Sequence, residues 1–130
     1  MRSRLGAMEN LISVQPVLPT KDVSLGIAYY VERLGFQLAF QDSEQDPHYA
    51  GLRRGPVELH LQWHDSAEWE RTERPMLRIV TADLDSLFAE LEHKGVFHKA
   101  TAIRETPWGT REFAFYDSSG NGLTFYSDRA

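Results

Sequence analysis

The chain has 130 residues, about the size of one ordinary domain, with 42% hydrophobic and 25% charged residues. Nineteen acidic side chains against fourteen basic ones give a formal net charge of −5, which argues against a nucleic-acid partner and favours a neutral or cationic ligand. The absence of cysteine excludes a disulfide scaffold, a zinc–thiolate site and a cysteine nucleophile, and it fits a cytoplasmic location. No apolar run reaches the roughly 20 residues of a membrane-spanning helix, so we expect no membrane partner.

The first half of the chain predicts a strand and a helix behind a flexible leader, residues 1–10, which lacks the apolar stretch of a secretory signal. Residues 11–20 are rich in β-branched side chains and predict a strand. Pro16 cannot donate a ladder hydrogen bond, so this strand lies at a sheet edge or bends there. Residues 21–35 predict a helix with Asp22 as its N-cap, because apolar side chains recur at near-helical spacing.

Three strands follow, predicted over residues 36–42, 48–55 and 57–64. The last of them, VELHLQWH, alternates with a period of two, as expected of a strand with one buried face. Its polar face carries Glu58 and His60, and this pair could hold a metal ion, line a ligand cleft or meet water.

The second half repeats this order of elements after a polar linker, residues 65–75, with room for one helical turn. We expect two βαβββ modules, about residues 11–64 and 76–127, within a single α+β domain over residues 11–130. Two curved mixed sheets, each with a helix on one face, leave their open faces to form a cleft. The predicted elements of this half are a strand over 76–82, a helix over 83–95 capped by Asp83, and strands over 100–109, 110–117 and 122–127.

The sequence resembles the vicinal oxygen chelate superfamily, which includes glyoxalase I, extradiol dioxygenases and antibiotic resistance proteins. The resemblance is carried by PVLPTKDVSLGIAYYVERLGF (16–36), YAG (49–51) and PWGTREFAFYDSSGNGLTF (107–125), and it is closest to the bleomycin resistance protein family. It implies paired βαβββ modules in a homodimer, with ligand clefts at the subunit interface. It also implies that Pro16 is the hinge at which the N-terminal strand leaves its own subunit to join the partner's sheet.

Enzymes of this superfamily bind a divalent metal through four side chains, and the resemblance carries those positions to Gln15, Glu58, Met76 and Thr124. Of these, only Glu58 is a strong ligand for such an ion. A catalytic metal site requires about three strong protein ligands. We therefore expect no metal and no cofactor, although His60 lies close enough in the strand to add a second ligand to Glu58.

The predicted ligand-binding residues fall into two groups, and other aromatic side chains are expected in the core. The resemblance implies a cleft with flat aromatic walls, at which a planar molecule stacks. Where the bleomycin binders carry a tryptophan on the first strand of the second half, this chain has Arg78. The stacking group is Phe40, Tyr49, Trp108 and Tyr126, the polar group is Glu58, His60, Gln62 and Arg78, and the expected core aromatics are Trp63, Phe88 and Phe125.

Three functions remain open from the sequence. The first is a metal-free, dimeric protein that sequesters a planar, cationic antibiotic such as bleomycin. The second is a metal-dependent lyase or dioxygenase of the same superfamily, with a degenerate site at Glu58 and His60. The third is a binder of an unidentified metabolite.

Overall fold

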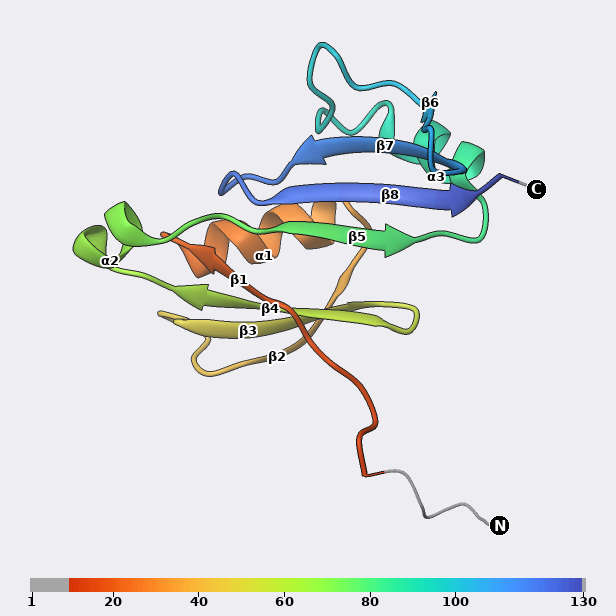
Figure 1. Cartoon of the computed structure of the whole chain (residues 1–130). Coiled ribbons are helices and arrows are strands. Elements are labelled where there is room, and N and C mark those ends of the chain that lie inside the picture. Colours follow the sequence, from red (N-terminus) through yellow and green to blue (C-terminus); the bar gives the residue numbers. More distant parts are fainter. Residues whose placement is uncertain (1–9, 130) are drawn as a thin grey trace.

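A computed structural model describes residues 10–129, and within them the chain forms two four-stranded mixed sheets, each with a helix of its own (Figure 1). The α+β fold of paired βαβββ units is therefore confirmed. The predicted leader lies outside the described residues except for Asn10. The first unit contains β1 (Val17–Thr20), α1 (Val23–Glu32), β2 (Gln37–Gln41), β3 (Tyr49–Arg54) and β4 (Val57–Trp63). The second contains β5 (Met76–Val80), α3 (Leu84–Leu91), β6 (Arg104–Glu105), β7 (Thr110–Tyr116) and β8 (Gly122–Asp128), and α2 (Ser66–Arg71) connects the two.

The two sheets share one topology, with the orders β1-β4-β3-β2 and β5-β8-β7-β6. The parallel pairs are β1 with β4 and β5 with β8, the first and last strands of each unit in chain order. The remaining pairs are antiparallel. The strands β1 and β5 are consequently edge strands at equivalent places, and Figure 1 shows β5 running above β1 and β4.

The helices begin where the sequence predicts. The Leu25 amide donates to the Asp22 carboxylate over 3.0 Å, and the Ser86 amide donates to Asp83 over the same distance, so both predicted N-caps are confirmed. The connecting helix α2 occupies the predicted linker and begins with a reciprocal capping box between Asp65 and Glu68. No helix in residues 10–129 is long and apolar enough to cross a membrane.

The alternation in β4 separates a buried face from an accessible one. Leu59 and Leu61 are buried and belong to a core cluster that draws side chains from both sheets. Helix α1 approaches β4 closely at Gly26, where a Cβ atom would lie 2.8 Å from the Leu61 side chain. The opposite face of the strand carries Glu58 and His60, both partly exposed, so it is free to form a site.

The predicted strand over 11–20 is wrong in its first half, because β1 begins only at Val17. The Pro16 carbonyl accepts a hydrogen bond from the His60 amide over 2.9 Å, but proline has no N–H to return. Residues 11–16 extend away from the body of the chain, and Leu11, Ile12 and Val14 are each at least 86% exposed. We call residues 11–16 the N-terminal arm.

The predicted strand over 100–109 is also largely wrong, since only Arg104–Glu105 pairs with β7. The Thr106 amide donates to the Thr110 carbonyl and the Gly109 amide donates to the Thr106 carbonyl, so this segment closes a tight loop instead. Pro107 and Gly109 are typical of such turns.

Trp63 is not a core residue as predicted, because its side chain is about a third exposed, whereas Phe125 is buried and Phe88 packs against the core. Trp63 ends β4 opposite Thr20, the last residue of β1, and its ring stacks on His48 with centroids 4.4 Å apart.

A buried polar network joins the two units. The Tyr30 hydroxyl of α1 donates to the Asp117 carboxylate over 2.7 Å, and the Asn121 amide nitrogen donates to both Asp117 and the Pro19 carbonyl over 3.1 Å. Tyr30 and Asn121 are almost fully buried. Burial and the neighbouring Asp117 carboxylate raise the pKa of Tyr30 well above its ordinary value, so the hydroxyl remains a donor.

We predict that Tyr30→Phe lowers the free energy of unfolding by about 1.5–3 kcal/mol, because it removes a hydrogen bond to a charged, buried acceptor. Urea denaturation measures the change. Tyr29→Phe is the matched control, since the Tyr29 hydroxyl makes only a 3.4 Å contact with the Tyr116 carbonyl at a more exposed position. An equal loss in the two variants would contradict the role given to Asp117.

Candidate ligand-binding site

Three of the predicted side chains form an aromatic cluster on the open face of the first sheet. The Phe40 and Tyr49 rings are nearly parallel, 4° apart with centroids separated by 6.2 Å. The His60 ring meets both edge-on, at 5.2 Å from Phe40 and 5.4 Å from Tyr49. Phe40 remains 42% exposed, so the cluster presents ring surface for a further stacking partner.

Gly51 creates the space in which the Phe40 ring lies. It pairs with Phe40 on one side and with His60 on the other. A Cβ atom at Gly51 would lie 2.6 Å from the Phe40 ring, which is too close for any side chain. The missing side chain of Gly51 therefore lets the Phe40 ring lie across β3.

A chain of hydrogen bonds runs through the same face. The Tyr49 hydroxyl lies 2.8 Å from His60 Nδ1, and His60 Nε2 lies 2.8 Å from Glu58 Oε2. A neutral imidazole with its proton on Nε2 satisfies both bonds. Arg53 donates to the other oxygen, Glu58 Oε1, over 2.7 Å. The hydrogen bond from His60 and then that from Arg53 hold the pKa of Glu58 below its ordinary value, so Glu58 is ionised and both of its oxygens are engaged.

The open face of the second sheet carries a different arrangement, centred on Arg78. Its guanidinium carbon lies 4.3 Å from the centroid of the Tyr126 ring. Its Nη2 donates to Glu112 Oε2 over 2.9 Å, and that oxygen also accepts from the Thr110 hydroxyl over 2.6 Å. Glu112 is buried, and the hydrogen bond from Arg78 is the main cause that lowers its pKa, with a further contribution from the Thr110 hydroxyl.

The predicted site residues thus fall into two clusters, one on each sheet, apart from Trp108, which lies in the loop between β6 and β7 and is 63% exposed. Gln62 is exposed on the first sheet and pairs with Tyr49 in the β3–β4 register. Glu58 and Arg78 both line a groove of about 400 Å³, and residues 13–16 of the N-terminal arm form part of its wall.

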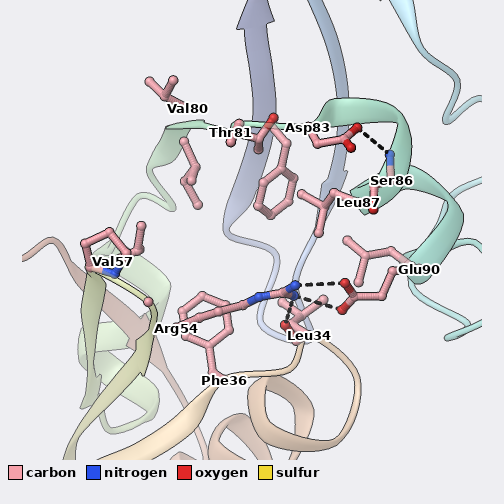
Figure 2. A pocket seen from close by; sticks show the side chains of 16 residues that line it. Leu34, Phe36, Arg54, Val57, Val80, Thr81, Asp83, Ser86, Leu87 and Glu90 are labelled. Carbon is pink, nitrogen blue, oxygen red and sulfur yellow. Dashed lines mark hydrogen bonds and ion pairs between the residues drawn. The ribbon is translucent and has the colours of Figure 1, made fainter.

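A cavity of about 520 Å³ lies between the two units and is lined by neither cluster (Figure 2). It opens between the β3–β4 turn and α3, with Leu34, Phe36 and Leu87 among its apolar walls. At one side Arg54 donates to both carboxylate oxygens of Glu90, over 2.8 and 2.9 Å, and so connects the units.

Sequence reasoning missed Arg53 and Glu112, the two residues that engage the predicted Glu58 and Arg78. A signal for Glu112 is present in the segment TREFAFY, where it alternates with the buried Phe113 and Phe115 and so must face the open side. Arg53 follows Tyr49 by four residues in β3, so it lies on the same open face of that strand.

The four positions that hold a metal in the enzymes do not form a suitable donor set here. Gln15 lies in the N-terminal arm, and its amide donates to the Ser13 hydroxyl. The Thr124 hydroxyl donates to the Met76 sulfur over 3.1 Å. Glu58 is occupied by His60 and Arg53, and within residues 10–129 no three His, Cys, Asp or Glu side chains are grouped to hold a metal ion. The residues therefore do not fit a divalent metal.

Paired βαβββ sheets with open, aromatic faces define a protein of the glyoxalase-like fold class. The chain belongs to the Glyoxalase/Bleomycin resistance protein/Dioxygenase superfamily, whose family model matches residues 12–125.

Individual relatives agree with this assignment. A bleomycin resistance protein of Geobacillus stearothermophilus is 27% identical over 127 residues, which cover 85% of this chain and 92% of the relative. The crystal structure of a bleomycin-binding protein from Streptomyces verticillus, complexed with copper(II)-bleomycin, matches with a TM-score of 0.73 and 30% identity, over 91% of this chain and 97% of that chain. A bleomycin resistance determinant encoded on the transposon Tn5 matches in fold, with a TM-score of 0.76 and 22% identity over 92% and 100% of the two chains.

We predict that Glu112 makes the protein less stable in acid. The pKa of Glu112 is lower in the folded protein than in the unfolded chain. Its carboxylate therefore stabilises the folded state at a pH above the pKa of the unfolded chain, and this contribution is lost as the pH falls through the pKa of the folded protein. The free energy of unfolding of wild type relative to Glu112→Gln should therefore fall between about pH 6 and about pH 3. A difference that stays constant over this range, measured by urea denaturation, would contradict the assignment of Glu112 as an ionised partner of Arg78.

Proposed function

We propose that this protein sequesters a planar small molecule of the bleomycin type by non-covalent binding. The observation that carries the proposal is the pre-formed cluster of Phe40, Tyr49 and His60, whose rings already pack together and are partly exposed. Such a surface gains about 0.5–1.5 kcal/mol per stacked ring pair beyond the area it buries. The similarity to proteins named for bleomycin resistance and bleomycin binding supports this ligand class.

The proposal assigns stacking to Phe40, Tyr49, Trp108 and Tyr126. Glu58, His60, Gln62 and Arg78 orient the polar groups of the ligand. Any attraction for a cationic group comes from the ring faces and from the net charge of −5 rather than from Glu58, because that carboxylate is already paired. Binding alone lowers the concentration of free drug, so no catalytic residue and no cofactor are assigned, and the predicted cytoplasmic location suits such a role.

The proposed active form is a homodimer. In it the open face of the first sheet of one copy meets the open face of the second sheet of the other copy. The exposed apolar residues support this form, because Met76, Val80 and Phe40 lie uncovered on strands β5 and β2. The N-terminal arm adds Leu11, Ile12 and Val14. In the proposed dimer Pro16 is the hinge from which the arm reaches the partner's sheet.

Calorimetric titration with metal-free bleomycin tests the proposed function. We predict saturable binding to the wild-type protein and an affinity about 2- to 10-fold lower for Phe40→Ala, because one stacked pair is lost. Trp63→Ala is the matched control, since Trp63 is exposed to a similar degree, 37%, but stacks on His48 at the end of β4. Absence of saturable heat with the wild type would refute the proposal in its specific form.

Sedimentation analysis of Pro16→Ala tests the hinge. Proline lowers the conformational entropy of a flexible backbone, which is worth about 0.4–1 kcal/mol of free energy per site. A dimer contains two such hinges. We expect the variant to remain folded and its dimer dissociation constant to rise roughly fourfold or more. An unchanged constant would show that Pro16 is not the hinge.

A further inference from the structure

The guanidinium of Arg78 is held on the second sheet by an aromatic ring and by a carboxylate. Its carbon lies over the Tyr126 ring, 4.3 Å from the ring centroid. Glu112 occupies one edge, accepting from Nη2 over 2.9 Å and from Nη1 over 3.4 Å. With both contacts made, 43% of the Arg78 side chain is still exposed.

Glu112 is itself fixed, so the orientation of Arg78 is fixed with it. The Glu112 side chain is only 5% exposed, and its Oε2 accepts from the Thr110 hydroxyl over 2.6 Å. The hydroxyl of Thr110, the first residue of β7, lies 2.8 Å from that of Thr106 in the preceding loop. A guanidinium oriented in this way loses little conformational entropy when a ligand lies on it.

The positive charge of Arg78 is already balanced by Glu112, so the planar surface of the guanidinium is what it offers to a ligand. The carboxylate of Glu112 balances the positive charge at close range, so a simple ionic attraction for a distant ligand group is weakened. The face turned away from Tyr126 is a planar, weakly hydrated surface, and guanidinium planes stack well on aromatic rings. The N–H groups that Glu112 does not engage can donate to acceptors at the rim of a stacked ring.

We propose that Arg78 is a specificity-determining stacking platform for the ring system of the ligand. This inference rests on the proposed function and specifies which part of a ligand meets the second sheet. The platform selects a planar aromatic group that is neutral or anionic and carries oxygen acceptors at its edge. A planar cation is disfavoured at this position, and any cationic part of the ligand extends toward the ring faces of the first sheet.

The substitution Arg78→Lys separates shape from charge, because lysine keeps the positive charge and lacks the plane. We expect the affinity for metal-free bleomycin, measured by calorimetry, to fall about 2- to 10-fold in Arg78→Lys and by a similar factor in Arg78→Ala. Arg74→Lys is the matched control, since Arg74 also stacks on an aromatic ring, 3.8 Å from the Trp69 centroid, but beside α2. This control should bind as tightly as the wild type. If Arg78→Lys binds bleomycin with wild-type affinity, the proposal that Arg78 is a stacking platform is wrong.

Two planar probes of similar size test the ligand class. 2-Naphthoate should displace bleomycin from the wild type at a lower concentration than 2-naphthylmethylammonium, and Arg78→Ala, which leaves the Glu112 carboxylate unpaired, should abolish or reverse this preference. Equal displacement by the two probes, or stronger displacement by the cation, would overturn the selectivity. Failure of wild type to bind bleomycin at all refutes the proposed function, whereas normal wild-type binding with an unaffected Arg78→Lys refutes the platform alone.

Discussion

The two carboxylates of the candidate site, Glu58 and Glu112, are each paired with an arginine of their own sheet. Glu58 is held by Arg53 and by His60, and Glu112 is held by Arg78. A carboxylate engaged in this way cannot serve a divalent ion without losing those partners, and the cost of leaving an arginine unpaired opposes the exchange. The faces therefore offer oriented planes, the rings of Phe40 and Tyr49, in place of free charge. This pairing distinguishes a surface for stacking from a surface for metal chemistry.

Most of the fold follows from local patterns in the sequence. Period-two alternation predicts most of the strands, and the carboxylate caps Asp22 and Asp83 predict where the helices begin. Both signals depend on residues only a few positions apart. The failures have a common cause in tertiary contacts. Residues 11–16 have strand-like side chains but do not form part of a strand, and the segment around Pro107 closes a loop through the hydrogen bonds of Thr106 and Thr110 and does not extend β6. Trp63 alternates correctly yet stays about a third exposed, because it ends β4 opposite the last residue of β1.

The sequence predicts which side chains of the candidate site lie on the open faces of the sheets, but not which side chains bond to one another. The alternation in β4 places Glu58 and His60 on the open side, and the family resemblance supplies Phe40 and Tyr49, which the structure brings together with His60. The partners Arg53 and Glu112 depend on the register between strands, which one sequence does not determine. Gly51 likewise acquires its role only because Phe40 crosses over it in the folded sheet.

The central claim is that binding occurs through flat surfaces and requires no metal. The most direct measurement is a calorimetric titration of metal-free bleomycin into protein that has been dialysed against a chelator, repeated after Ni²⁺, Zn²⁺, Fe²⁺ or Mn²⁺ is added back to the protein. The account predicts saturable binding of the drug to the chelator-treated protein, and no stoichiometric uptake of any of these ions by the protein alone. Stoichiometric uptake of one ion that is lost in Glu58→Ala, together with drug binding or turnover only in the metal-loaded protein, would contradict it.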